Sequence, residues 1–255
     1  MIGTDKYAYS SKLRRAEPIT KILITIGIMF LCIILDDVYV SIATIISMSI
    51  LNISMGGHKF KDLWKMFKIP MGFIFIGVIT IIISRYSLDA NLILGFNLGA
   101  HKYGISSQGV FQALQIFTKA MGVISSVYFL VMNTAMTDIT LALYRLRFPR
   151  LFVELLELVY RFIFILTETA ENIKIAQDSR LGYINMKLSY RSTSELISRL
   201  FISSYKKADA IYNALESRGY DGELVTVGME YEIDTRITTA AIVVAGIQVW
   251  IYMMI

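Results

Sequence analysis

Long apolar runs, separated by short charged segments, constrain the fold of this chain more than any other feature. The five runs are residues 22–35, 38–55, 69–84, 107–132 and 237–255. A helix needs about 20 apolar residues to cross a bilayer, so the first run must extend back to Pro18. Because 55% of the residues are hydrophobic, the chain is too apolar for an ordinary soluble domain. We therefore expect an all-α polytopic membrane protein with about five transmembrane helices.

The basic residues are distributed unevenly between these runs. Of the 25 Lys and Arg residues, 22 lie in residues 1–21, 56–68 and 133–236. Cytoplasmic segments of membrane proteins are enriched in Lys and Arg, and this asymmetry fixes orientation. We therefore predict a multi-pass protein of a bacterial or archaeal cell (inner) membrane with a cytoplasmic N-terminus. The predicted parts are four spans in residues 1–132, a cytoplasmic insert of long coupling helices at 133–236, and a last span at 237–255.

Residues 151–166 offer a competing interpretation, because they are apolar enough to suggest a sixth span. Glu154, Glu157 and Arg161 lie within them, and each charge would cost about 2.5–3.5 kcal/mol at a bilayer centre. A span there would also place most cations of the insert outside. We therefore predict an amphipathic helix at the cytoplasmic interface instead.

The segments that connect the spans carry simpler signals. Asp36 and Asp37 interrupt the apolar sequence and predict a tight, solvated outer turn. Gly56 and Gly57 open a segment with four lysines, which we interpret as a basic cytoplasmic loop over residues 56–68. Residues 91–105 predict a short outer hairpin.

The polar insert is predicted to contain three helices. The first covers residues 137–148 and is closed by Pro149; the second continues from there to Arg180. The third begins at Ser192-Thr-Ser-Glu195, which has the pattern of a capping box, and stops at Arg218-Gly219.

Two of these predicted helices end with almost the same sequence. The first end is Ser179-Arg180-Leu181-Gly182 and the second is Ser217-Arg218-Gly219. Glycine adopts the left-handed conformation that stops a helix, and a cation is favoured at the negative end of the helix dipole. A pair of ordinary helix ends is one interpretation. Two such ends in one polar insert also indicate paired docking points for a soluble partner.

The sequence contains no recognisable chemistry of its own. A Walker lysine motif is absent, so the chain does not hydrolyse ATP by itself. His58 and His101 are predicted on opposite sides of the membrane, and Cys32 lies within an apolar run, so no shared metal site is expected. The cations lie between apolar runs and not on one basic helix, which argues against a nucleic-acid partner. We expect no catalytic residue, no metal ligand and no cofactor.

Several segments resemble the CbiQ family, the transmembrane (T) component of energy-coupling factor (ECF) transporters for cobalt. The resemblance extends from end to end of the chain. The segments that carry it are Asp5-Lys-Tyr-Ala-Tyr9, Leu13-Arg14, Glu154-Leu-Leu, Tyr160-Arg-Phe-Ile163, Ala176-Gln177 with Ser179-Arg180-Leu-Gly-Tyr183, and Ala214-Leu-Glu-Ser-Arg218-Gly-Tyr-Asp-Gly222.

This resemblance implies a non-catalytic subunit that joins ABC-type ATPase subunits to a substrate-capturing membrane subunit within the lipid bilayer. It also implies that Arg180 and Arg218 contact grooves on the two ATPase subunits. The other residues of the implied coupling motifs are Ser179, Gly182, Ser217 and Gly219. The chain departs from the family pattern by carrying Ser in place of Ala, and by placing Leu181 between Arg180 and Gly182.

Cobalt as the transported substrate depends on the resemblance alone. The same coupling role for nickel or for a vitamin is the nearest alternative. A membrane-embedded enzyme and a stand-alone carrier are alternatives from other classes. The first lacks a catalytic constellation, and the second lacks ionisable residues buried in the spans.

Overall fold

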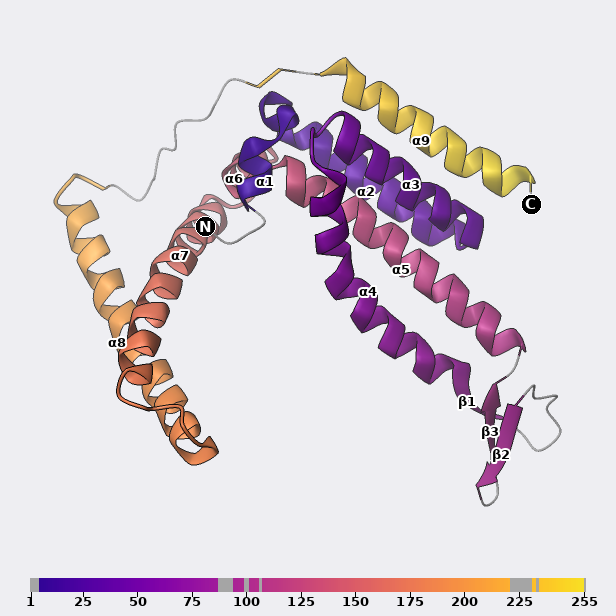
Figure 1. Ribbon diagram of the computed structural model, residues 1–255. Helices are drawn as coiled ribbons and strands as arrows, with labels where there is room; N and C mark the ends of the chain where they lie inside the picture. Colours follow the sequence, from indigo (N-terminus) through magenta and orange to yellow (C-terminus); the bar gives the residue numbers. More distant parts are fainter. Residues whose placement is uncertain are drawn as a thin grey trace. The chain divides into compact units, whose positions relative to one another are not determined.

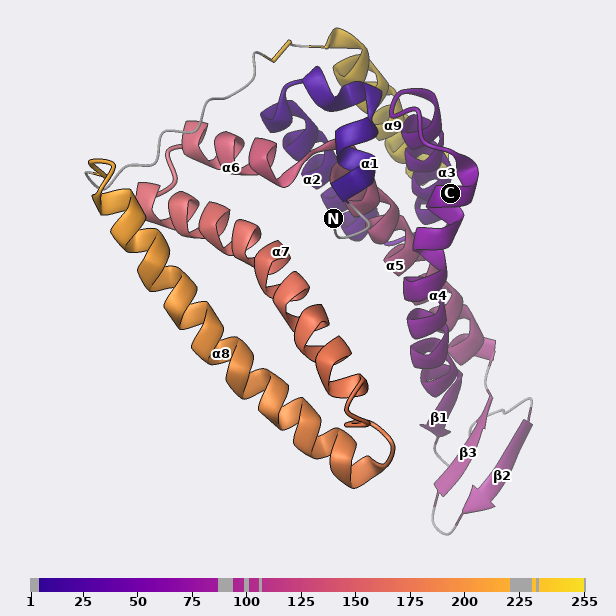
Figure 2. The ribbon, with the colours of Figure 1, turned by 60° about the vertical axis from the view of Figure 1, so that its left-hand side comes forward.

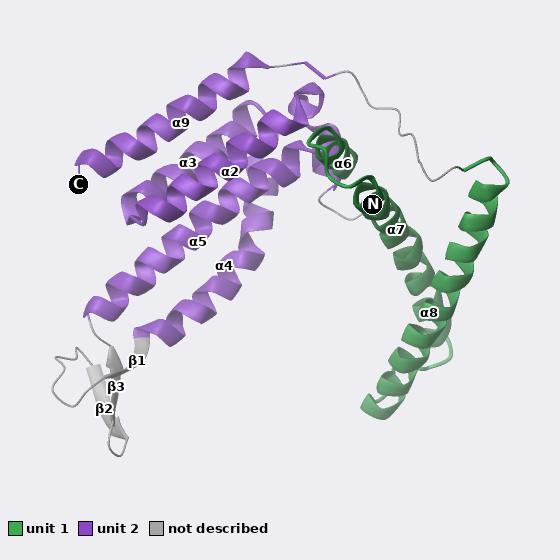
Figure 3. Ribbon diagram, turned by 180° about the vertical axis from the view of Figure 1, so that it is seen from behind, with its two compact units in different colours: residues 1–2, 136–228 green, residues 3–135, 229–255 purple. Residues whose placement is uncertain are grey.

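The computed structural model describes residues 5–86, 94–98, 101–105, 107–220, 231–232 and 234–254. The chain divides into two compact units (Figure 3). Residues 3–135 and 229–255 form one, which we call the bundle; residues 136–228 belong to the other, which we call the insert.

The bundle is built from helices that pack around α5 (Figure 1). Helix α5 contacts α2, α3 and α4, while α9 packs on α2 and α3. The core of the bundle contains Ile28, Met48, Phe129 and Val244, which come from four different helices. The elements are α1 (Asp5–Ser10), the 3-10 turn η1 (Lys12–Arg15), α2 (Pro18–Leu35), α3 (Val38–Ser54), α4 (Phe60–Ile82), α5 (Ser107–Asn133) and α9 (Thr235–Met254).

The apolar helices confirm the predicted fold class of a multi-pass membrane protein. Helices α2, α4, α5 and α9 are long and apolar enough to cross a membrane, and α3 is an apolar helix of 17 residues. Helix α2 begins at Pro18, the position at which the short first run had to be extended. The segment that suggested a sixth span lies in α7 (Arg150–Asp178), which is not among these helices.

The predicted basic loop is wrong, because most of it is helical. Helix α4 begins at Phe60, so Lys61, Lys65 and Lys68 lie on its first three turns. Pro70 lies inside the same helix and lacks the N–H that would bond to the carbonyl of Met66. The hydroxyl of Tyr128, from α5, donates to that carbonyl at 3.1 Å. This bond supplies a partner for the freed carbonyl, so the helix continues through the proline.

The turn between α2 and α3 is tight, as expected, but Asp36 does more than face solvent. Asp36 adopts a left-handed conformation (φ 41°), and its carboxylate accepts from Lys119 Nζ at 2.6 Å. Gln115 Nε2 also donates to the backbone carbonyl of Asp36 at 2.6 Å. Asp37 caps α3 by accepting from the N–H of Tyr39. Two side chains of α5 therefore hold this turn.

The predicted hairpin is confirmed and carries a further strand. The strands β2 (Leu94–Leu98) and β3 (His101–Ile105) pair in antiparallel fashion. The strand β1 (Ile83–Tyr86) pairs with the other edge of β3, which gives the order β1-β3-β2. Residues 91–93 and 99–100 of the predicted hairpin lie outside the described residues.

A buried polar cluster closes the end of the bundle where α5 terminates. The side-chain oxygen of Asn133 accepts from Ser11 Oγ at 2.6 Å and lies 3.3 Å from Nε2 of His58. Its amide nitrogen donates to Asn52 Oδ1 and to the carbonyl of Phe129, both at 2.8 Å. Asn133 is fully buried, and these bonds use both lone pairs and both N–H groups of its amide. His58 is therefore a buried structural residue of the connection between α3 and α4.

Lys21 also belongs to this cluster. The sequence suggested a cation that only marks topology, yet the side chain is completely buried. Its ammonium group donates to the carbonyls of Leu13 at 3.1 Å and Asn133 at 2.9 Å. Gly56 lines the same cluster, where a Cβ atom would lie 2.5 Å from Asn133 Oδ1 and from the carbonyl of Asn52. The cluster thus has no room for a larger residue at this position.

The insert contains the three predicted helices, with one corrected start (Figure 2). They are α6 (Met136–Arg145), α7 and α8 (Met186–Glu216). Asn185 caps α8 by accepting from the N–H of Leu188 at 2.8 Å, so the predicted capping box at Ser192 is wrong. Ser192 lies within α8 and is buried. Its hydroxyl donates to the carbonyl of Gly182 at 2.9 Å.

Candidate coupling site

Helices α7 and α8 form an antiparallel pair, which places their C-terminal ends at opposite ends of the pair (Figure 2). Hydrogen bonds of the described residues connect them in antiparallel order. Gln177 Nε2 donates to the carbonyl of Ser192 at 2.9 Å, and Lys207 Nζ donates to Thr169 Oγ1 at 2.7 Å. Tyr220, just after α8, donates from Oη to Glu154 Oε2 at 3.3 Å. Most other side chains of the pair remain exposed or half-buried. The pair is therefore held by a few polar contacts and not by a large apolar core.

The end of α7 is closed by a Schellman motif. The N–H of Leu181 bonds to the carbonyl of Asp178 at 2.8 Å, and the N–H of Gly182 bonds to the carbonyl of Gln177 at 2.9 Å. The residue in the left-handed conformation is Leu181 (φ 61°) and not Gly182. This corrects the prediction that Gly182 supplies the conformation that stops the helix.

The end of α8 has the same hydrogen bonds in the same positions. The N–H of Gly219 bonds to the carbonyl of Glu216, and the N–H of Tyr220 bonds to the carbonyl of Leu215, both at 3.0 Å. Gly219 is left-handed (φ 79°), as predicted. Leu181 therefore corresponds to Gly219, and Arg180 and Arg218 occupy the same position of the motif, one residue earlier. No residue is inserted in the first end when the two are compared by structure.

The serines of the two ends are equivalent as well. Ser179 Oγ donates to the carbonyl of Ile175 at 2.9 Å, and Ser217 Oγ donates to the carbonyl of Asn213 at 2.8 Å. Each bond spans four residues and engages a carbonyl of the last turn. Both serines thus bond within their own helix, and the arginine is the cationic side chain that each end exposes.

Gly182 has a packing role. A Cβ atom at this position would lie 2.7 Å from Ser192 Oγ and 2.9 Å from the carbonyl of Gln177. The contact brings the chain after α7 close to the second turn of α8. The sequence did not indicate it, because the two residues that meet are separated by ten positions across a turn.

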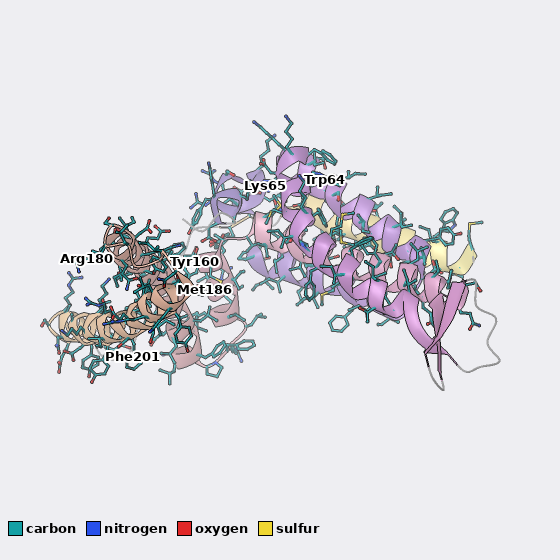
Figure 4. The ribbon with its side chains drawn as sticks, turned by 60° about the horizontal axis from the view of Figure 1, so that its bottom comes forward. Trp64, Lys65, Tyr160, Arg180, Met186 and Phe201 are labelled. Carbon is teal, nitrogen blue, oxygen red and sulfur yellow. The ribbon has the colours of Figure 1, made fainter. Side chains whose placement is uncertain are left out.

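Arg180 and Arg218 are exposed, and neither guanidinium has a hydrogen bond or ion pair within the described part of the chain (Figure 4 labels Arg180). The structure does not bring them together. Between Ser192, which touches Gly182, and the end of α8 at Glu216, the helix rises roughly 36 Å. A guanidinium offers five N–H donors in a fixed plane, suited to carboxylates and carbonyls of a partner surface. The insert thus presents two separate, similar cationic points.

The described residues contain no cluster of three or more His, Cys, Asp or Glu side chains. His58 lies just before α4, while His101 lies on β3, beyond the other end of α4. Cys32 is buried in the bundle with its sulfur 3.8 Å from Ser41 Oγ.

Comparison with known proteins places this chain in a family. A family model described as cobalt transport protein (CbiQ) matches residues 9–227. The chain is 32% identical over 230 residues to the cobalt transport protein CbiQ of Salmonella typhimurium, which covers 88% of this chain and 99% of that protein.

More distant relatives include a protein from a differently named group. The CbiQ protein of Rhodobacter capsulatus is 26% identical over 222 residues, covering 86% of this chain and 85% of that protein. The energy-coupling factor transporter transmembrane protein EcfT of Thermosediminibacter oceani is 28% identical over 253 residues, covering 93% and 91%. With a family model that matches most of its length, this multi-pass chain belongs to the CbiQ family of cobalt transport proteins.

Proposed function

We propose that this chain is the T component of an energy-coupling factor importer for cobalt. In this role it binds no nucleotide and no metal, and it transmits movement from ATPase subunits to a membrane subunit that captures the substrate. The observation that carries the proposal is the pair of equivalent helix ends, each of which presents an exposed arginine without a partner in the described residues.

The distance between the two arginines favours two ATPase subunits over one. Roughly 36 Å of helix separates the ends, so a single groove does not accommodate both. In each end the Schellman bonds already satisfy carbonyls of the last turn, so Arg180 and Arg218 are free to bond outward. A guanidinium in a groove lined by carboxylates or carbonyls makes charge-assisted bonds, which are stronger than neutral ones.

Exposed apolar side chains on the insert support a second partner within the membrane. Ile197, Phe201, Tyr205 and Tyr212 follow one another along α8 and are 60–73% exposed. An apolar surface of this kind marks an interaction with another protein or with lipid. We assign this surface to the substrate-capturing membrane subunit, with the insert at the cytoplasmic face.

This orientation is tested by cysteine labelling of intact cells from outside. Met254→Cys, at the far end of α9, should be labelled, whereas Ser194→Cys, on an exposed face of α8, should not. Ser192 is a poor reporter because it is buried, and the native Cys32 is buried too. Labelling of Ser194→Cys in intact cells would overturn the cytoplasmic assignment of the insert.

The coupling role is tested by reversing both arginines in the assembled complex. A single Arg→Ala change removes charged hydrogen bonds worth about 1.5–3 kcal/mol, which weakens ATPase binding about tenfold to a hundredfold. The double variant Arg180→Glu/Arg218→Glu adds repulsion to that loss. We expect the ATPase subunits to be lost on pull-down, or to hydrolyse ATP without cobalt uptake.

The matched control is Arg199→Glu/Lys206→Glu, which makes the same charge change on exposed residues within α8. It should assemble and take up radioactive cobalt as the wild type does. If the Arg180→Glu/Arg218→Glu variant also assembles and transports normally, the two motifs are ordinary helix ends. Competition of cobalt uptake by nickel or by vitamins distinguishes the proposed substrate from the alternatives.

A further inference from the structure

We propose that the first three turns of α4 form a binding site for the headgroups of anionic phospholipids. Lys61, Lys65 and Lys68 are four and three residues apart, so they lie on one face of the helix. We call these three residues the basic stripe. All three are exposed, and none of their ammonium groups has a hydrogen bond or ion pair within the described part of the chain.

The packing of α4 fixes the direction in which the basic stripe faces. On the other side of the helix, Leu63 and Phe67 are 2% and 8% exposed and pack with Met121 and Met132 of α5. The helix therefore cannot turn its lysines inward without exposing this core. Like charges four residues apart repel one another, and a bound anion relieves that repulsion.

Asp62, next to Lys61 in the sequence, forms no ion pair with the basic stripe within the described part of the chain. Asp62 lies in the first turn of α4, but it accepts a hydrogen bond from the hydroxyl of Tyr7, in α1, at 3.2 Å. Its pairing with α1 holds the start of α4 against the bundle.

Exposed aromatic residues lie among the lysines, and exposed apolar residues follow them along α4. Phe60 and Trp64 stack with their ring centroids 6.4 Å apart, and both are more than half exposed; Trp64 lies beside Lys65 (Figure 4). Further along α4, Ile69 and Phe73 are each 81% exposed. The lysines and the aromatic pair thus alternate at the start of the helix, and exposed apolar residues follow them, a combination that suits the interface and the adjoining acyl-chain layer of a bilayer.

These features favour a lipid over a free phosphate ion. Each lysine near an anionic membrane surface strengthens the attraction of its segment to that surface about fivefold, so three together give roughly a hundredfold. A free phosphate would use the ammonium groups but would leave the exposed aromatic pair and the apolar continuation without a role. The proposal depends on the place of the chain in a membrane and not on the coupling function.

Tryptophan fluorescence provides the test, because the chain has only two tryptophans. The full chain is placed in nanodiscs of phosphatidylcholine that contain brominated phosphatidylglycerol or, at the same mole fraction, brominated phosphatidylcholine. The Trp250→Phe variant leaves Trp64 as the reporter, and Trp64→Phe leaves Trp250, near the far end of α9, as the internal control. We expect Trp64 to be quenched several-fold more by the anionic lipid and Trp250 to be quenched equally by both.

Charge variants in the Trp250→Phe background distinguish a site from a general attraction. The variant Lys61→Gln/Lys65→Gln/Lys68→Gln should lose the preference for the anionic lipid, whereas the three Lys→Arg changes should keep it. The matched control Lys174→Gln/Lys187→Gln/Lys206→Gln, on exposed residues of α7 and α8, should also keep it. Equal quenching of Trp64 by the two lipids, a preference that survives the first variant, or its loss on adding millimolar inorganic phosphate would each overturn the proposal.

Discussion

Replacement of Asn133 by leucine should destabilise the bundle by about 0.5–3 kcal/mol. The substitution keeps the approximate size of the side chain but removes the four hydrogen bonds made by its buried amide. Ser11 retains the carbonyl of Gly56 as an acceptor at 3.4 Å, and the carbonyl of Phe129 remains within its helix. Asn52 Oδ1 and His58 Nε2 are the groups left without their partner.

The magnitude follows from those two groups. A buried polar group without a partner costs about 1–3 kcal/mol, so the loss amounts to about 2–6 kcal/mol. Burial of the leucine side chain offsets about 1.5–3 kcal/mol at most, because the pocket is shaped for an amide. We therefore expect a net loss of about 0.5–3 kcal/mol.

The assay is unfolding of the purified full chain in mixed micelles by increasing fractions of sodium dodecyl sulfate, followed by tryptophan fluorescence. Asn172→Leu, the same substitution at an exposed position of α7, is the matched control and should change little. Gly56→Ala should also destabilise the bundle, since its Cβ would meet Asn133 and Asn52 at 2.5 Å, whereas Gly72→Ala has open space and should not. If Asn133→Leu unfolds within about 0.5 kcal/mol of the wild type, the cluster does not hold the bundle.

Three further predictions follow from the helix ends and from α4, each measured as a change in thermal stability of the purified chain. Leu181→Gly should stabilise the end of α7 by up to about 1 kcal/mol, because a leucine in the left-handed conformation is strained. Gly219→Ala should destabilise the end of α8 by a similar amount. An unchanged melting temperature in both variants would contradict the proposed equivalence of the two helix ends. Gly182→Ala should lower the stability by about 1–3 kcal/mol, because the added methyl group would collide with Ser192. Adding Ser192→Ala to the same chain should recover part of that loss. If the stability losses of the two substitutions simply add, the contact with Ser192 is not the cause. Tyr128→Phe should lower the stability of the wild type by about 1–3 kcal/mol. The loss should be much smaller in Pro70→Ala, because the restored N–H bonds to the carbonyl of Met66. Equal losses in both backgrounds would contradict the role given to Tyr128.

The start of α2 and the boundary between α2 and α3 could be read from the sequence because they depend on local properties, whereas the third span was predicted from Ile69 and α4 begins at Phe60. Hydropathy placed the start of α2 at Pro18 and separated α2 from α3 at Asp36 and Asp37. The same kind of reasoning placed the end of α8, because Gly219 is left-handed and follows the arginine of the last turn. Helix length, apolar content and a stop signal are each encoded within a few residues, so no tertiary contact is needed to recognise them.

The predictions that were wrong concern residues whose role depends on distant partners. The four-lysine segment looks like a loop, yet Leu63 and Phe67 pack on α5 and keep it helical. Ser192 has the sequence pattern of a cap, but its hydroxyl bonds to Gly182. Lys21 looks like a topology signal, but the carbonyls of Leu13 and Asn133 receive its ammonium group inside the bundle.

The sequence by itself determined that the chain is a multi-pass helical protein with a polar insert and two arginine-bearing helix ends, because these features depend on composition and local order. Only the tertiary structure decided that the two ends are equivalent. Leu181, not Gly182, takes the left-handed position, since Gly182 must lie against Ser192, and no side chain fits there. The tertiary structure also placed the two arginines at opposite ends of an antiparallel helix pair, because the direction in which α8 packs on α7 is set by contacts between residues far apart in the chain.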